Sequence, residues 1–139
     1  MRIVYGTVAY LVVTFPLAYV WHLVLFKETY DSLGYFSREE PIVLFGFFAI
    51  LLQGILLSIL YPYVCPNMSV SRGAMRFAAL LGGYHWTMHV LAEAAKHQIS
   101  PLPTWFALES GYLMIQFALG GLLMALVYRV PQSPAPAEP

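Results

Sequence analysis

Four long apolar runs constrain the fold of this chain more than any other feature of its sequence. They extend over residues 3–26, 42–61, 74–95 and 104–128. Each has the roughly 20 residues that an α-helix needs to cross a hydrocarbon core about 30 Å thick. Membrane β-strands are shorter and alternate in polarity, and backbone groups in lipid must be satisfied internally, as they are in a helix. The sequence therefore predicts an all-α, polytopic membrane protein with four transmembrane helices in an up-down bundle.

The composition agrees with a lipid-facing surface. Hydrophobic residues make up 60% of the chain and charged residues 10%, whereas soluble domains average about 25% charged residues. We expect one transmembrane domain over residues 1–130 and a flexible, Pro/Ala-rich tail over residues 131–139. The formal net charge of zero provides no basic surface for nucleic acid. The expected partners are the lipid bilayer and either another membrane protein or a second copy. The pairs Gly82-Gly83 and Gly120-Gly121 are candidates for close helix packing within or between chains.

The connecting segments indicate a topology. Residues 27–41 hold most of the acidic side chains, and residues 62–73 are rich in residues that favour loops. The first run is too long in its apolar part for a cleaved signal peptide, so we expect it to be retained. Basic residues favour the cytoplasmic side. Four lie on the side of the termini and three on the other: Arg2, Arg72, Arg76 and Arg129, against Lys27, Arg38 and Lys96. This distribution predicts cytoplasmic termini.

One hydrogen-bonding side chain from each run falls at about the same depth. A helix rises about 1.5 Å per residue, which converts position in a run into depth. His85 comes to the middle of the bilayer, and one polar residue from each of the other runs reaches the same level: Thr14, Gln53 and Gln116. We expect these four to form a layer of interhelical hydrogen bonds that fixes helix register, at about 0.6 kcal/mol per bond.

A second set of polar residues lies nearer to one membrane face. It contains His22 from the first run, His89 and Glu93 from the third, and Glu109 from the fourth. At 100° per residue, His85 and His89 lie about 40° apart on one helix face. Ionisable groups within a membrane normally face the bundle interior. The opposite face of the third run is expected to meet lipid, and it carries Leu80, Val90, Leu91 and Ala94.

Two interpretations of these residues differ in class. The first is a non-enzymatic structural or accessory membrane protein, in which the middle layer sets packing and the second set reaches water at the helix ends. The alternative is a metal or ligand site formed by His22, His89, Glu93 and Glu109, because zinc, iron and manganese accept histidine and carboxylate ligands. The spacing H-x3-H-x3-E matches neither H-E-x-x-H nor E-x-x-H, so it names no metal family. A haem held by His22 and His89 is a variant of this alternative.

Two further functions stay open. A chain from Glu93 or Glu109 through His89 and His85 to Gln53 would suit a proton or ion path. A membrane enzyme acting on a lipid-like substrate would use the same groups as acid and base. The sequence has no nucleophile elbow, phosphate loop or dinucleotide fingerprint. The single cysteine, Cys65, is expected to be an inert thiol near a helix end.

Overall fold

The structure is a computed structural model that describes residues 1–36, 38 and 40–129. Every regular element within these residues is a helix, as the sequence predicts. The α-helices are α1 (Arg2–Val20), α2 (Lys27–Ser32), α3 (Val43–Val64), α4 (Val70–Phe77), α5 (Gly83–Trp86), α6 (Ala92–Lys96) and α7 (Leu102–Tyr128). Three π-helical turns separate some of them: η1 (Trp21–Leu25), η2 (Ala78–Gly82) and η3 (Thr87–Leu91). The tail expected over residues 131–139 lies outside the described residues.

Three helices within the described residues are long and apolar enough to cross a membrane. They are α1 continued by η1 over Arg2–Leu25, α3 over Val43–Val64, and α7 over Leu102–Tyr128. These bounds follow three of the four apolar runs closely. The first helix continues through Pro16, and α3 continues through Pro62 into its last turn.

The third apolar run is helical from Val70 to Lys96 but is not one long α-helix. The turns η2 and η3 divide it into α4, α5 and α6. A π turn bonds i to i+5 rather than i to i+4, so it adds a residue to one turn and rotates everything that follows. A count at a constant 100° per residue therefore fails beyond such a turn.

The rotation at η3 corrects one sequence expectation. Val90 was expected to face lipid, but it is fully buried, and its carbonyl accepts a hydrogen bond from Trp105 Nε1 at 3.1 Å. Leu80 and Leu91 do lie exposed, as expected. Val90 thus faces α7 rather than lipid.

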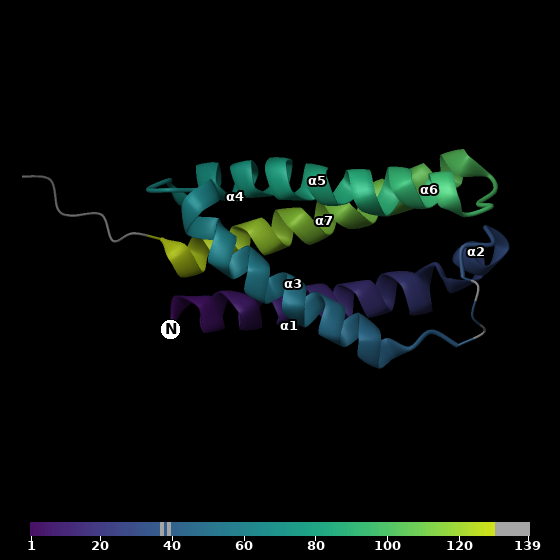
Figure 1. Ribbon diagram of the computed structural model, residues 1–139, viewed down its shortest axis with the longest axis horizontal. Coiled ribbons are helices and arrows are strands. Elements are labelled where there is room, and N and C mark those ends of the chain that lie inside the picture. Colours follow the sequence, from purple (N-terminus) through teal and green to yellow (C-terminus); the bar gives the residue numbers. More distant parts are fainter. Residues whose placement is uncertain (37, 39, 130–139) are drawn as a thin grey trace, which may run out of the picture.

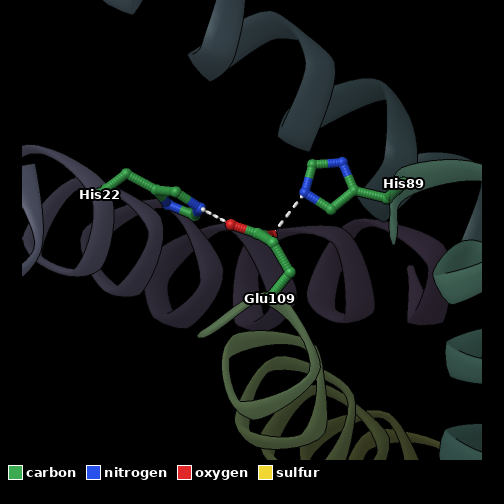
Figure 2. A group of neighbouring side chains, drawn as sticks. All are labelled: His22, His89 and Glu109. Carbon is green, nitrogen blue, oxygen red and sulfur yellow. Dashed lines mark hydrogen bonds and ion pairs between the residues drawn. The ribbon is translucent and has the colours of Figure 1, made fainter. Parts of the chain in front are cut away.

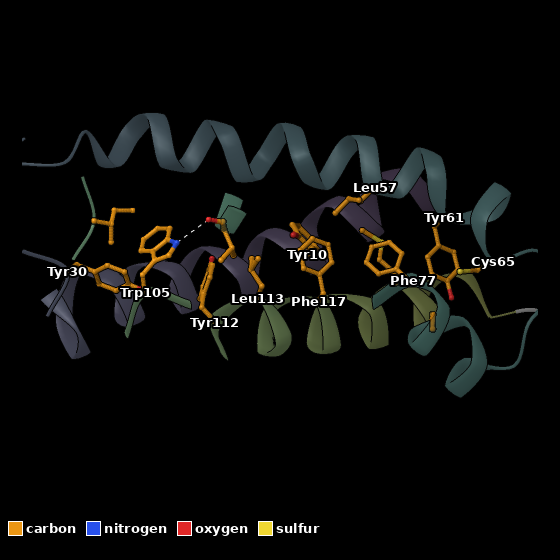
Figure 3. Packing of buried hydrophobic residues seen from close by; sticks show 14 of the residues in the cluster. Tyr10, Tyr30, Leu57, Tyr61, Cys65, Phe77, Trp105, Tyr112, Leu113 and Phe117 are labelled. Atoms are coloured by element: carbon orange, nitrogen blue, oxygen red, sulfur yellow. Dashed lines mark hydrogen bonds between the residues drawn. The ribbon is translucent and has the colours of Figure 1, made fainter. Parts of the chain in front are cut away.

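Helix α7 is the central element of the bundle. Of its most apolar window, 44% is buried, against 11% for α1–η1 and 17% for α3. Figure 1 shows α7 between α1 and the α4–α6 segment, and the contacts agree, because α7 packs against α1, α4 and η2. Its buried residues recur at the period of one helix face, for example Trp105, Glu109 and Tyr112. Figure 3 shows Trp105, Tyr112 and Phe117 of this face in the core.

The outer surface of the bundle is apolar and part of its interior is polar. Exposed side chains on α1 and α3 include Val12, Leu52 and Leu56. Buried polar side chains include Thr14, Ser58, Glu109 and Gln116. This distribution suits a protein whose surroundings are hydrocarbon, because polar groups there must be paired inside the protein.

A short helix appears where the sequence suggested only a connection. Helix α2 follows η1 and includes an i, i+4 ion pair between Lys27 Nζ and Asp31 Oδ2 at 2.6 Å. Its Tyr30 is fully buried. In Figure 1, α2 and α6 lie at one end of the molecule and the N-terminus at the other. Helix α2 therefore brings Tyr30 toward the polar residues at that end.

Candidate functional site

Glu109 on α7 is a fully buried carboxylate that contacts groups from other elements. Its Oε1 lies 3.2 Å from His22 Nε2, and its Oε2 lies 2.7 Å from His89 Nε2. Tyr30 donates its hydroxyl hydrogen to Oε1. Figure 2 shows the two imidazoles on either side of the carboxylate. We call His22, His89 and Glu109 the His/Glu cluster.

Both histidines of the cluster lie on π-helical turns. His22 belongs to η1 and His89 to η3, on helical segments that are far apart in sequence. Such turns are rare in proteins and occur frequently at functional sites, because the extra residue redirects a side chain. The π turns thus aim two imidazoles at one carboxylate.

The hydrogen-bond roles at His22 can be assigned from its neighbours. His22 Nδ1 lies 3.0 Å from the carbonyl oxygen of Ala18, which can only accept, so Nδ1 carries a hydrogen. In a neutral imidazole, Nε2 then has a lone pair and no hydrogen. Trp21 Nε1 donates to the Tyr30 hydroxyl at 3.2 Å, which leaves the hydroxyl hydrogen for Glu109 Oε1.

The assignment leaves two lone pairs facing each other. Nε2 of a neutral His22 points its lone pair at Glu109 Oε1, which is an acceptor when ionised. The contact becomes favourable when a proton is added to the pair, on His22 as an imidazolium or on Glu109 as a carboxylic acid that donates to Nε2. It also becomes favourable when a cation lies between the two atoms. A backbone carbonyl that holds Nδ1–H is also the usual outer partner of a metal-binding histidine.

The cluster geometry is close to that of a metal site. The three ligand atoms all lie within 4.8 Å of one another. Ligand atoms that share one tetrahedral zinc ion at about 2.1 Å lie roughly 3.4 Å apart. His22 Nε2 lies 3.2 Å from Glu109 Oε1, close to that value, and His89 Nε2 lies 2.7 Å from the other carboxylate oxygen, Oε2, which is a hydrogen-bond distance. The three residues therefore bring candidate metal ligands close together.

Glu93, the fourth residue expected in this set, lies apart from the cluster. Its carboxylate pairs with Lys96 Nζ at 2.5 Å and with His97 Nε2 at 3.0 Å. Lys96 and His97 follow Glu93 by three and four residues at the end of the same helix, and the side chains of both partners are exposed. The expectation that Glu93 converges with the other three is therefore wrong, because local ion pairs hold it at the helix end.

Three of the four residues expected in the middle layer, Gln53, His85 and Gln116, are joined by hydrogen bonds in the structure. Tyr10, which was not expected there, connects them. Tyr10 donates its hydroxyl hydrogen to Gln53 Oε1 at 2.9 Å and accepts from Gln116 Nε2 at 2.6 Å. Gln53 Nε2 lies 3.2 Å from His85 Nδ1, which accepts its hydrogen. Tyr10, Gln53, His85 and Gln116 thus form a connected set, which we call the middle layer.

Thr14 shares the burial of the middle layer but not its bonds. Its Oγ1 is buried with no hydrogen-bond partner among the described residues. The sequence-based depth was reasonable, since Thr14 is fully buried one helical turn from Tyr10. The structure corrects the expectation that its hydroxyl bonds across the helices.

The middle layer and the cluster are linked by a pair of rings. The imidazoles of His85 and His89 stack with centroids 5.4 Å apart. They are one helical turn apart, on the face that the sequence predicted. The polar interior therefore extends from Glu109 to Gln116 through side chains of four segments of the chain.

Sequence reasoning missed two tyrosines, Tyr10 and Tyr30. Tyrosines in membrane proteins are commonly interface anchors, so they were not considered as interior donors. Tyr30 also lies in a segment expected to be a loop. The available signal was the Lys27/Asp31 spacing, which favours a helical turn around Tyr30.

Three groups outside the membrane-spanning segments are held in their neutral forms. Burial, and then the charge of Glu109, raise the pKa of Tyr30. Burial, followed by the charges of Glu109 and Glu93, raises the pKa of Tyr35 to about 12. Burial also raises the pKa of the Cys65 thiol, whose Sγ donates to the carbonyl of Gly73 at 3.4 Å. Tyr30 is therefore a steady donor to Glu109, and Cys65 has the environment of an unreactive thiol.

Comparisons with known proteins add no assignment. No protein-family model matches the chain, and no characterised protein or solved structure resembles it significantly.

Proposed function

We propose that this protein is an integral membrane protein that holds a divalent transition-metal ion at His22, His89 and Glu109. The observation that supports the proposal best is the contact between His22 Nε2 and Glu109 Oε1. Both atoms have lone pairs there when His22 is neutral, and a bound cation would satisfy both. The second histidine and the full burial of Glu109 complete a site of three ligands.

The ligand set suits a catalytic or ligand-binding ion better than a purely structural one. Two histidines and one carboxylate bind zinc in hydrolases and iron(II) in oxygenases. Three protein ligands leave coordination positions for water or a substrate. The chain itself would orient the ligands: the Ala18 carbonyl holds the His22 ring, and the Tyr30 hydroxyl holds Glu109. When bound, the ion would supply a Lewis acid inside a largely apolar bundle.

The same geometry favours a small ion over a haem. A haem held by His22 and His89 would need its iron and macrocycle between the two imidazoles. The Glu109 carboxylate lies in that position and contacts both rings (Figure 2).

We propose four membrane crossings in up-down order, with the Val70–Lys96 segment as the third. This segment packs along α7, and it joins the end of the molecule near α4 to the end near α6 (Figure 1). Both termini then share one face. The four-to-three distribution of basic residues favours the cytoplasm for that face.

A structural or accessory role is the second candidate, and the middle layer favours it. There each donor faces an acceptor, which is the pattern of a layer that fixes helix packing. An imidazolium at His22 paired with Glu109 would extend such a packing role to the cluster. In that case the partner would be another membrane protein or a second copy of this chain.

The test is the metal content of the purified protein. The protein is equilibrated with zinc, iron(II) or manganese, freed of loose metal and measured by elemental analysis. We expect a stoichiometric ion in the native chain and its loss in His22→Ala, His89→Ala and Glu109→Gln. Cobalt(II) substitution provides a second readout, because its absorption spectrum reports the ligands and their geometry.

Two variants serve as controls. Glu93→Gln changes a nearby carboxylate that pairs only with Lys96 and His97 among the described residues, so its metal content should stay unchanged. His85→Ala changes the histidine that bonds to Gln53, and it too should keep the ion. A native chain that binds no metal, or a metal lost equally in both controls, would refute the metal site and favour the structural role.

A further inference from the structure

A narrow apolar slot lies between the first and second membrane-spanning helices. It is formed by Phe15, Ala18, Tyr19, His22 and Leu23 on the α1–η1 side and by residues such as Gly46 and Ile50 of α3. Its volume is about 190 Å³. Gly46 contributes an opening, because a Cβ added there would meet nothing within 4 Å.

His22 is the only basic side chain among the residues that line this slot, and no acidic side chain lines it. Its side chain is 16% exposed, while the carboxylate that it contacts is fully buried. The exposed part of the His22 side chain thus forms part of the wall of the slot. Its remaining walls are nearly all apolar, so water gains little by occupying it.

The position of the slot determines which molecules can enter it. It lies between two helices that are each long and apolar enough to cross a membrane. The neighbouring exposed side chains are large and apolar, among them Val20, Val43 and Phe48. The phase outside the slot is therefore the hydrocarbon of the bilayer, and lipid-soluble molecules are the ones that can enter.

A more polar cavity adjoins the slot. It has a volume of about 370 Å³ and is lined by Arg38, Glu93 and His97 as well as by aromatic side chains. The two cavities share Phe36, Pro41 and Ile42 as wall residues. Polar groups thus lie beside an apolar slot, an arrangement that matches the two ends of an amphipathic molecule.

We infer that the slot admits an amphipathic, lipid-type molecule from the bilayer and seats its hydrocarbon chain against the edge of His22. This inference rests on the proposed function in one respect: the molecule is then the substrate or ligand of the metal site. The bilayer, rather than the aqueous phase, supplies it. The occupancy itself can be measured whether or not an ion is bound.

The experiment measures short-range magnetisation transfer from histidine ring protons to lipid. The protein is perdeuterated except at its histidine rings and placed in bilayers of protonated dimyristoyl phosphatidylcholine. The signals of the four histidines are assigned with single His→Gln variants. We expect cross-peaks from the His22 ring to the acyl methylene protons. His97, which lies at a helix end and is exposed, should instead exchange magnetisation with water.

Two glycine variants provide a matched comparison. Gly46→Leu would place apolar atoms in the slot, and its Cβ meets nothing within 4 Å. Gly83→Leu adds the same side chain at a position whose Cβ also meets nothing within 4 Å, in a different groove between the third helical run and α7. We expect the His22–lipid cross-peaks to be lost in Gly46→Leu and kept in Gly83→Leu. The helical content of both variants, measured by circular dichroism, should equal that of the native chain.

The outcomes separate this inference from the proposed function. Cross-peaks to water in place of lipid, cross-peaks to neither, or lipid cross-peaks that survive in Gly46→Leu would each overturn the inference, whatever the metal content. Lipid contact in a protein that binds no metal would refute the metal site alone and leave the slot as a lipid-binding site.

Discussion

The His/Glu cluster and the middle layer are two polar regions on one face of α7, and they differ in how their buried groups are paired. Glu109 and Gln116 are seven residues apart, or about two helical turns. In the middle layer, neutral groups pair donor to acceptor: Gln116 to Tyr10, Tyr10 to Gln53, and Gln53 to His85. In the cluster, a carboxylate meets two imidazoles, and one of these contacts needs an added positive charge.

The backbone conformation also differs between the two regions. The residues of the middle layer lie on regular α-helix, whereas both cluster histidines lie on π turns. Neutral, fully paired groups fix helix register at modest cost. A charged group that is incompletely paired in an apolar interior is costly, and such groups commonly mark function in membrane proteins. The comparison therefore indicates packing for the middle layer and binding for the cluster.

Glu109→Ala should give the largest loss of stability. The substitution leaves the Tyr30 hydroxyl and two imidazoles without their shared partner in a buried site. Breaking one partner of a buried charged group costs about 3–5 kcal/mol. The free energy of unfolding can be measured in mixed micelles by titration with sodium dodecyl sulfate. A decrease below about 1 kcal/mol, as for an exposed ion pair, would contradict the description of the cluster as a buried charged site.

Glu109→Gln serves as the control for that prediction. It keeps the shape of the side chain and one carbonyl acceptor for Tyr30, so it should recover part of the stability. It removes the carboxylate charge, so it should still abolish metal binding. Recovery of both properties would show that the charge is not needed.

Tyr30→Phe should have the next largest effect and should act on the same site. The hydroxyl donates to Glu109 Oε1, and hydrogen bonds to charged groups contribute about 1.5–3 kcal/mol. Loss of an outer-shell partner also lowers metal affinity about 10–100-fold. Competition with a chelator measures the affinity, and detergent titration measures the stability.

Tyr35→Phe is the matched control for Tyr30→Phe. Tyr35 lies close to Tyr30, with ring centroids 6.2 Å apart, and its ring packs on Trp105. Its hydroxyl makes no hydrogen bond to any residue that the structure describes. Metal affinity should therefore stay unchanged in Tyr35→Phe. Equal losses in both variants would mean that Tyr30 acts through ring packing alone.

The sequence was informative about the depth of side chains along the helices. A rise of 1.5 Å per residue brought Gln53, His85 and Gln116 to one level, and the structure connects them through Tyr10. The same counting brought His22 and Glu109 to one level from different runs, and they are in contact. The rise along a helix thus brings distant residues to one level even where π turns such as η1 and η3 interrupt the helix, whereas the angle per residue does not survive such turns.

Sequence reasoning failed where an irregular turn, local ion pairs or a short helix determined the position of a side chain. The turn η3 rotates Val90 into the core, which no constant angle per residue reproduces. Glu93 has partners three and four residues away, and these hold it at the helix end. Tyr30 depends on a helix of six residues, too short to have an apolar period of its own.

Gly121→Ala tests the apolar part of the same α7 face, beyond the middle layer. A Cβ at Gly121 would lie 2.8 Å from the carbonyl oxygen of Ala74, a backbone atom that cannot rotate away. Helices α7 and α4 would have to separate, and such overpacking costs typically about 1–3 kcal/mol. Gly83→Ala is the control, because its Cβ meets nothing within 4 Å. If both alanine variants have the stability of the native chain, close approach of α7 and α4 is not required.

Gln116→Leu should give the smallest loss, although it removes a buried polar side chain from the middle layer. Leucine has a similar size, and the Tyr10 hydroxyl can still donate to Gln53. Interhelical hydrogen bonds in membranes average about 0.6 kcal/mol and reach about 1.7 kcal/mol. We expect a decrease within that range and an unchanged metal content. The double variant with Gln53→Leu measures the coupling between the two amides. A loss as large as that of Glu109→Ala would reverse the comparison, because the neutral layer would then contribute as much to folding as the charged cluster.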